Sequence, residues 1–147
     1  MTQPVVPNTN APAPMRATVQ WLENNTFVAT SGSGHAVVMD GNKAVAASPM
    51  EMVLMAAGSC SSVDVVSILT KAKQPFVRCE VRVEGKRANA VPAVFTDIHL
   101  HFTIYGNDVA EKHVERAVKL SADKYCSVSI MLGASVTVTH SFSIEPA

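Results

Sequence analysis

Residues 48–73 read SPMEMVLMAAGSCSSVDVVSILTKAK and predict one long helix around which the other elements are arranged. Ser48 and Glu51 form an S-x-x-E capping box, which satisfies the first backbone N–H groups of a helix. Pro49 fits at the first helical position, where its missing N–H has no hydrogen bond to lose. Pro75 prevents continuation, so we expect the helix to end near Lys73.

The predicted helix is apolar around nearly its whole circumference. Such a helix is buried, either within a large core or between subunits. Asp64 and a run of serines interrupt the apolar surface, which argues against a helix that crosses a membrane. Cys60 lies among the small residues of Ala57–Ser62, which leave room for another helix or a substrate.

The composition favours one domain that does not bind nucleic acid. The chain has 147 residues, and its 12 basic and 12 acidic side chains give a net charge of zero. Without a global positive field, nucleic acid is not an expected partner. The apolar fraction of 48% is high for a soluble protein, so we expect a partner subunit to cover apolar surface.

Residues 1–14 are rich in proline and have no apolar periodicity, so we expect a disordered arm followed by a single domain over residues 15–147. The N-terminus has no apolar segment of the kind found in secretory signals. The expected compartment is therefore the cytoplasm. There the three cysteines stay mostly reduced, and any disulfide is transient.

Alternating apolar residues predict three short strands before the long helix. The first covers residues 15–23, and Asn24-Asn25 predicts the hairpin turn that leads to the second strand at residues 26–30. A flexible Ser-Gly-Ser-Gly loop precedes the third strand at residues 35–39.

Two long strands are expected after the helix. In the first, Val77, Cys79, Val81 and Val83 alternate with charged residues, and the second covers residues 94–105. The apolar residues of this second strand that should face inward are Ile98, Leu100, Phe102 and Ile104.

Two helical segments and a last strand complete the chain. Asp108 and Glu111 indicate a second capping box for a helix over residues 109–124, and residues 125–132 predict a further helical segment. The last strand covers residues 136–144. This element order predicts an α+β fold with a mostly antiparallel sheet and a long buried central helix.

Two of the three cysteines lie in settings that suggest chemistry. Cys60 lies in Gly-Ser-Cys-Ser-Ser and Cys126 in Tyr-Cys-Ser-Val-Ser, and neither replaces an obvious core aliphatic residue. Cys79 lies on an inward strand face, where a free cysteine behaves as a small hydrophobe. The sequence does not show by itself whether Cys60 and Cys126 meet in space.

The histidines are weaker candidates for a site. His99 and His101 share one strand face, as metal ligands sometimes do. No third ligand is spaced to join them, so we expect an exposed strand face and no metal site. His140 lies on the apolar face of the last strand, where we expect a hydrogen-bonded core histidine.

Two stretches together carry a family signature. They are Ser48-Pro49-x-Glu51 with Met55-Ala56-Ala57-Gly58-Ser59-Cys60, and Tyr125-Cys126-Ser127-Val128-Ser129. This pattern resembles the OsmC / organic hydroperoxide resistance (Ohr) superfamily, and is closest to its uncharacterised OsmC-like subgroup. The resemblance, from about Met15 to the C-terminus, implies the OsmC-like fold in an intertwined homodimer, with the active sites at the subunit interface.

The resemblance also implies a redox chemistry for the two cysteines. Cys60 would be the peroxidatic thiol, which an organic hydroperoxide oxidises to a sulfenic acid. Cys126 would be the resolving thiol, which condenses with that sulfenic acid to a disulfide that an external dithiol reduces. Neither a metal nor an organic cofactor is implied, and the role would be oxidative-stress defence.

The chain departs from the catalytic members of the superfamily at the helix start. Those members pair an arginine with a glutamate directly after the helix-start proline, but here that position holds Met50. Glu51 is one residue later and therefore points about 100° away around the helix. No arginine occupies a matching position, and Arg16 at the start of the first strand is expected to be solvated.

Asp64 is a second departure, because it lies one helical turn after Cys60. A nearby carboxylate raises the pKa of a thiol and so disfavours the nucleophilic thiolate. His35, Lys124 or a residue of a second subunit are candidate cations to offset it. Asp64 is equally compatible with a site for a ligand that is polar at one end.

Two functions therefore remain open from the sequence. The first is a cytoplasmic, dimeric thiol peroxidase that acts on organic hydroperoxides through Cys60 and Cys126. The alternative is a non-peroxidase OsmC-like dimer that binds a small apolar ligand near Cys60. A structural dimer with inert cysteines is the simplest third interpretation. The sulfur positions and the nearest cation distinguish them.

Overall fold

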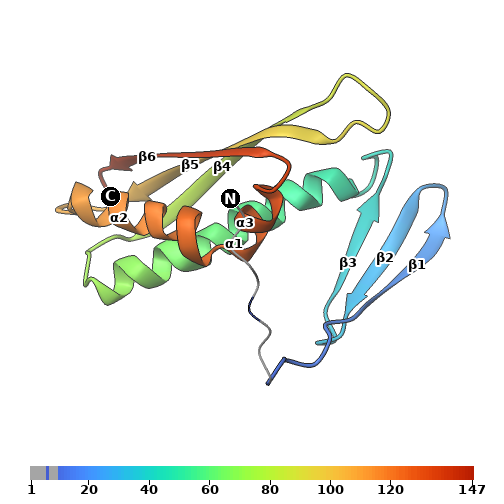
Figure 1. The fold of residues 1–147 in the computed structure, drawn as a ribbon, viewed down its shortest axis with the longest axis horizontal. Coiled ribbons are helices and arrows are strands. Elements are labelled where there is room, and N and C mark those ends of the chain that lie inside the picture. The colour runs from blue at the N-terminus through green and yellow to red at the C-terminus, as the bar shows by residue number, and fades with distance from the viewer. Residues whose placement is uncertain (1–5, 7–9) are drawn as a thin grey trace. The chain divides into compact units, whose positions relative to one another are not determined.

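The computed structural model describes residue 6 and residues 10–147, so the expected arm at residues 1–14 lies partly outside the described residues. The chain forms two compact units, one ending at Met52 and the other running from Val53 to Ala147. Figure 1 shows the three strands of the first unit in blue and the helices and strands of the second in green to red.

The first unit contains a three-stranded antiparallel sheet. Its strands β1 (Ala17–Glu23), β2 (Thr26–Ser31) and β3 (Ala36–Asp40) pair in chain order. The predicted hairpin turn is confirmed, because Asn24 adopts a φ of 49° between β1 and β2. All seven residues of β1 are exposed, including Trp21 at 66%, so this sheet leaves apolar side chains uncovered within the chain.

Asp40 shapes the loop that leads from β3 to the long helix. Its carboxylate accepts the backbone N–H groups of Asn42, Ala44 and Val45 at 2.8, 3.0 and 3.1 Å. These hydrogen bonds, that of Asn42 foremost, favour the ionised carboxylate and hold the pKa of Asp40 below its ordinary value. The loop is thereby fixed just ahead of the helix cap.

The long helix α1 (Pro49–Lys71) begins with the predicted capping box. The Glu51 N–H donates to the Ser48 hydroxyl oxygen at 3.2 Å, and the Ser48 N–H donates to the Glu51 carboxylate at 3.0 Å. Both partners of the S-x-x-E pattern therefore act as the sequence indicated. The helix stops two residues before the predicted end, and Lys73 adopts a φ of 55° in the following turn.

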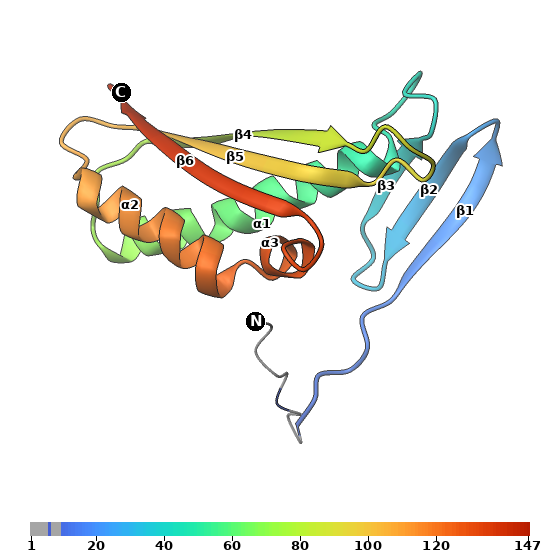
Figure 2. The same ribbon diagram turned by 45° about the horizontal axis from the view of Figure 1, so that its top comes forward.

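The second unit contains a second sheet of β4 (Arg78–Arg87), β5 (Phe95–Tyr105) and β6 (Thr137–Glu145). β4 and β5 are antiparallel, whereas β6 returns parallel to β5. The helices α2 (Glu111–Leu120) and α3 (Ser127–Leu132) lie with α1 on one face of this sheet (Figures 1 and 2).

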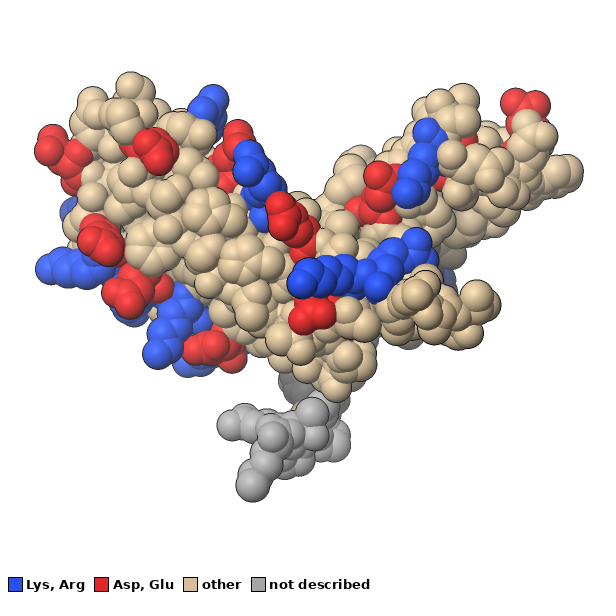
Figure 3. All heavy atoms as spheres, turned by 90° about the horizontal axis from the view of Figure 1, so that it is seen from above, with Lys and Arg blue, Asp and Glu red and all other residues tan. Residues whose placement is uncertain are grey.

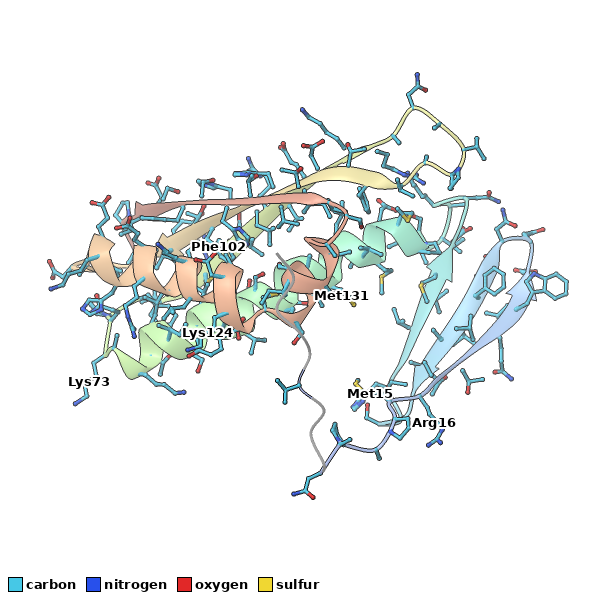
Figure 4. All side chains as sticks on the ribbon, in the orientation of Figure 1. Met15, Arg16, Lys73, Phe102, Lys124 and Met131 are labelled. Carbon is cyan, nitrogen blue, oxygen red and sulfur yellow. The ribbon has the colours of Figure 1, made fainter. Side chains whose placement is uncertain are left out.

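The core of the second unit lies between this sheet and the helices. The four β5 residues predicted to face inward are each at most 1% exposed: Ile98, Leu100, Phe102 and Ile104. In Figure 4 the Phe102 label marks a ring between β5 and the helices. The helices contribute Val65 and Leu69 from α1 and Val114 and Ala117 from α2, all fully buried.

Within the single chain α1 is only partly buried, so of the two predicted forms of burial, that between subunits stays a prediction. The buried residues of α1 are Ala57, Gly58, Ser61, Val65 and Leu69. Only 28% of the most apolar window of α1 is buried inside the molecule. By length and composition α1 could cross a membrane, but the core helix of a soluble protein passes the same test.

Two local predictions are corrected. Val77 was expected to face inward but is 70% exposed, because β4 begins only at Arg78. The Asp108 cap does not form, because Asp108 has a φ of 64° and the N-cap of α2 is Ala110. The side chain of Gln74 instead accepts the Ala110 N–H at 2.9 Å and supplies the missing partner.

Candidate active site

Cys60 and Cys126 come together although they belong to distant parts of the sequence. Cys60 lies near the middle of α1, and Cys126 is the N-cap of α3. Each thiol acts on the pKa of the other through a side-chain hydrogen bond. Both are free cysteines, Cys60 partly exposed and Cys126 buried.

A turn of π-helix positions Cys126. α2 continues directly into η1 (Ser121–Tyr125), and the Cys126 N–H donates to the Ser121 carbonyl at 2.9 Å. Cys126 then leaves helical geometry, with φ −75° and ψ 101°, and its sulfur accepts the Ser129 N–H at 3.4 Å. A single-turn π-helix often lies at a functional site, since it shifts the side chains that follow it.

The Cys126 sulfur lies in a triangle with two serine hydroxyls. Ser61 donates to the sulfur at 3.2 Å, and the thiol donates to Ser129 at 3.3 Å. The two hydroxyl oxygens are 3.2 Å apart. Ser61 and Cys126 are fully buried and Ser129 is 3% exposed, so solvent does not compete for these hydrogen bonds.

The surroundings of the two thiols shift their pKa values in opposite directions. The Val128 N–H lowers the pKa of Cys60, but burial, the Cys126 thiol and Asp64 together raise it above its ordinary value. Burial raises the pKa of Cys126, but the Ser129 and Ser61 hydroxyls, the Ser129 N–H and the Cys60 thiol together outweigh it, and the pKa is lowered. When the pair loses one proton, these shifts favour the negative charge on Cys126 over Cys60.

Asp64 acts on Cys60 as the sequence indicated, since its charge is one of the causes that raise the pKa of that thiol. Its carboxylate also accepts the Ser121 hydroxyl at 3.0 Å. The same hydroxyl lies 3.3 Å from the Ser61 carbonyl. Asp64 thus links α1 to η1 through Ser121, and Ser121 in turn bonds to the backbone of Ser61, the residue whose hydroxyl contacts Cys126.

A groove of about 540 Å³ opens next to Asp64. Its lining includes the apolar residues Ile68 and Leu120 and the basic residues Lys71 and Arg116. The remaining residues of its lining are Ser67, Ala72 and Tyr125. A lining of apolar residues with charged groups of both signs suits a small molecule that is polar at one end.

The other predicted neighbours of the site have local partners. Lys124 lies at the end of η1 in Figure 4, and its ammonium is 5.5 Å from the centre of the Tyr125 ring. His35 belongs to the first unit, where its Nδ1 is 3.0 Å from the Ser33 hydroxyl. Glu51 is occupied in the helix cap. For His35, Lys124 and Glu51, a role at the Cys60 site stays a prediction.

Cys79 and the strand histidines lie away from this cluster. Cys79 is only partly buried on β4, and burial raises its pKa. His99 and His101 bond to hydroxyls of β6 at 2.6 to 3.1 Å, and within residues 6 and 10–147 no group of three potential metal ligands occurs. His140 does not meet its prediction, since its Nε2 is buried without a hydrogen bond.

The serines around Cys126 were not predicted as site residues from the sequence. Ser61, Ser121 and Ser129 are buried polar residues in helical segments. Serine is a poor helix former, so serines inside an apolar helix are a signal that the side chains serve another purpose. Their partners could not be paired from spacing alone, because they lie on α1, η1 and α3.

Comparison with known proteins places this arrangement in a family. Residues 40–141 match the family model described as OsmC-like protein. The chain is 52% identical to Protein YhfA of Escherichia coli strain K12 over 134 residues, which covers 90% of this chain and all of the relative.

Solved structures share the fold. A hypothetical protein from Aquifex aeolicus VF5 superposes with a TM-score of 0.84 at 30% identity, over 92% of this chain and 99% of that one. A Legionella pneumophila protein whose description reads organic hydroperoxide resistance protein OsmC superposes with a TM-score of 0.68. It is 15% identical and covers 91% of this chain and 99% of its own, which shows a common fold.

Proposed function

The chain belongs to the OsmC-like family, as its resemblance indicated, and from this premise we propose that it is a two-cysteine thiol peroxidase. Its substrates would be organic hydroperoxides, and its role oxidative-stress defence. The observation that carries the proposal is that Cys60 and Cys126 are free thiols close enough for each to shift the pKa of the other. Relatives of the same fold described as organic hydroperoxide resistance proteins support the substrate class.

The proposed reaction has two oxidative steps. The Cys60 thiolate attacks the distal oxygen of the hydroperoxide, the O–O bond breaks, and the leaving alkoxide takes a proton to become an alcohol. Cys126 then attacks the resulting sulfenic sulfur, the S–O bond breaks, and hydroxide leaves as water with one proton. An external dithiol reduces the Cys60–Cys126 disulfide and leaves as a disulfide itself.

The first step requires a thiolate on Cys60, and this is the demanding part of the proposal. A thiol of ordinary pKa is only about 3% ionised at pH 7, and the pKa of Cys60 is raised further. We therefore expect slow turnover at neutral pH that increases with pH. Its partial exposure, in contrast to buried Cys126, makes Cys60 the sulfur that a substrate reaches first.

We also propose that the active unit is a homodimer in the cytoplasm. The outward face of α1 carries exposed apolar residues, Met55, Val63 and Val66, at helical spacing. An apolar stripe of this kind needs a partner, and a second copy supplies an identical stripe that packs in the same way. Three free cysteines suit a reducing compartment.

Thiol titration tests the peroxidase proposal. Reduced protein is treated with cumene hydroperoxide, and free thiols are counted before and after. We expect two thiols to be lost, the loss to be absent in Cys60→Ser, and the disulfide to be absent in Cys126→Ser. Cys79→Ala is the matched control and should behave as the parent. A parent protein that reacts no faster than free cysteine would contradict the proposal.

The groove beside Asp64 favours the alternative function, a dimer that binds a small apolar ligand with one polar end. This groove lies one helical turn from Cys60, and its lining includes Lys71 and Arg116. A medium-chain fatty acid such as decanoate is a suitable probe, since its carboxylate complements the two cations. A rise in melting temperature with decanoate, lost in Arg116→Ala, together with absent hydroperoxide turnover, would select this function.

A further inference from the structure

The serines around Cys126 form a site of their own within the second unit. Two buried serines, Ser61 of α1 and Ser129 of α3, contact one sulfur, and a third buried serine, Ser121 of η1, lies behind Ser61. Buried hydroxyl groups are uncommon in an apolar helical layer. Ser61 and Ser129 contact the sulfur, at 3.2 and 3.3 Å. Ser121 does not contact it and instead bonds to Asp64 and to the Ser61 carbonyl.

The triangle can present three donors to a thiolate but not to a thiol. When Cys126 carries its proton, the thiol donates to Ser129 and accepts from Ser61. When the proton leaves, the Ser129 hydroxyl can rotate and donate to the sulfur, while Ser61 and the Ser129 N–H continue to do so. Hydrogen bonds to a charged acceptor are stronger than those to a neutral one, so this arrangement favours the thiolate.

We propose that Ser61 and Ser129 are positioning residues that hold the buried Cys126 sulfur as the nucleophile of the disulfide-forming step. The inference rests on the proposed function for the pairing of the two thiols, and deepens it. Cys60 reacts with the oxidant because it is partly exposed, and the buried Cys126 then attacks the oxidised Cys60 sulfur. The lowered pKa of Cys126 agrees with this division of labour.

Asp123, Lys124 and Tyr125 of η1 directly precede Cys126, and the groups that act on the pKa values of the pair lie on α1 and at the start of α3. Cys60 and Cys126 act on each other, and Asp64 acts on Cys60 from the next turn of α1. Asp64 reaches the serines only through the Ser121 hydroxyl. In variants that keep Asp64, a change in the pH dependence of Cys126 reactivity therefore reports on the hydrogen bonds to the Cys126 sulfur.

The test uses the full-length protein with 4,4′-dithiodipyridine, a small neutral disulfide, in a Cys79→Ala background. The Cys60 sulfur attacks the probe, the probe disulfide breaks, and one thiopyridone leaves with a proton. Cys126 then attacks the Cys60 sulfur of the mixed disulfide, and the second thiopyridone leaves. Two thiols are oxidised and one probe disulfide is reduced, so the two releases can be followed separately by absorbance.

We expect Ser61→Ala and Ser129→Ala to slow the second release about tenfold at pH 7 and to move its pH midpoint upward, with the first release unchanged. Ser121→Ala removes a buried hydroxyl that does not touch the sulfur, and should leave the midpoint in place. Ser62→Ala, whose hydroxyl bonds to the Gly58 carbonyl at 2.7 Å, should change neither release.

Two results would overturn the inference. One is a second release in Ser61→Ala and Ser129→Ala with the rate and midpoint of the parent, and the other is no second release in the parent itself. Because the probe is not a peroxide, serine dependence without hydroperoxide turnover leaves the inference standing and removes the proposed function. If the second release does not depend on the serines but the protein turns over hydroperoxide, only the inference about the serines is excluded.

Discussion

His140 carries the one buried side-chain nitrogen or oxygen without a hydrogen bond in the part of the chain that the structure describes. Its ring stacks on Phe102, with centroids 6.4 Å apart and planes 8° from parallel. Burial, with a smaller effect of His99, lowers the pKa of His140 below its ordinary value, against the pull of Asp123. The imidazole is therefore neutral in the folded protein at neutral pH.

This lowered pKa has a defined consequence for stability. Above the ordinary value of 6.5 both folded and unfolded chains hold His140 neutral, so no stability is lost. As the pH falls below 6.5 the unfolded chain binds a proton that the folded chain does not, and stability declines until the lower folded pKa is reached.

We predict that His140→Phe removes this decline. Phenylalanine keeps the stack on Phe102 and eliminates the unpaired nitrogen, whose burial costs about 1–3 kcal/mol. The variant should match or exceed the parent in urea unfolding at pH 8 and gain on it at pH 5.5. His35→Phe, at an exposed histidine of the first unit, is the control. An equal pH dependence in parent and His140→Phe would contradict the assignment.

The residues of the site show how far single positions can be predicted. Cys60 and Cys126 were predicted as site residues from their settings and from the family resemblance, and Asp64 as a neighbour of Cys60 from helical spacing; their roles stay predictions. Ser61 and Ser129 could not be, since a serine becomes part of a site only when α1 and α3 approach each other. The direction of each thiol's pKa likewise depends on these contacts, which sequence separation conceals.

Element boundaries follow local chemistry where the partners are near in sequence. The capping box of α1 and the turn at Asn24 depend on residues at most three apart, and both are confirmed. The start of α2 was misplaced because the Ala110 N–H is satisfied by Gln74. Gln74 precedes Ala110 by 36 residues, with β4 and β5 between them in the sequence. No local pattern reports such a partner.

The cap of α1 permits a direct test at this scale. Ser48 is nearly buried, and its hydroxyl is the acceptor for the Glu51 N–H. We predict that Ser48→Ala lowers the free energy of unfolding by about 1 kcal/mol, the usual cost of a lost N-cap. Ser62→Ala on the same helix, outside the cap, removes only a hydroxyl bonded to the Gly58 carbonyl and should cost less. Chemical denaturation measures both, and equal losses would argue against the cap.

Close approach of α1 to the second sheet occurs at Gly58. A methyl group there would lie 2.9 Å from Val83 Cγ2 and 3.2 Å from Val81 Cγ1. We predict that Gly58→Ala destabilises the protein, because overpacking costs about 1–3 kcal/mol and exceeds the gain of about 1 kcal/mol in helix propensity.

The matching test removes the closer of these two obstructions, the side chain of Val83. In a Val83→Ala background the closer of the two contacts is gone and Val81 Cγ1 at 3.2 Å remains, so the same change should destabilise the protein less. Thermal and urea unfolding of the parent, both single variants and the double variant complete the cycle. A Gly58→Ala effect that is the same in both backgrounds would show that the valine side chain does not limit this contact.

At the scale of the whole molecule, charge and apolar surface are arranged differently. Figure 3 shows acidic and basic side chains next to each other on the face it presents, in agreement with a net charge of zero. The apolar surplus is instead exposed on α1 and β1, where Val63 is 68% exposed and β1 has no buried residue. A chain with this distribution gains most by covering apolar surface with another protein chain.

The stripe on α1 gives the proposed dimer a sharp test. Met55, Ser59, Val63, Val66 and Thr70 are all exposed, and steps of three and four residues place them along one side of the helix. Two copies can pack these stripes together about a two-fold axis, since small and apolar side chains allow close approach. The centre of the stripe is Val63.

We predict that Val63→Lys converts a dimer into a monomer or prevents folding, because two ammonium groups would be buried opposite each other near the axis. Val77→Lys is the matched control, since Val77 is 70% exposed but lies outside α1, and it should remain dimeric. Light scattering coupled to size exclusion gives the mass of each. A parent that is monomeric at micromolar concentration, or a Val63→Lys variant that stays dimeric, would exclude α1 as the interface and leave its apolar face without a partner.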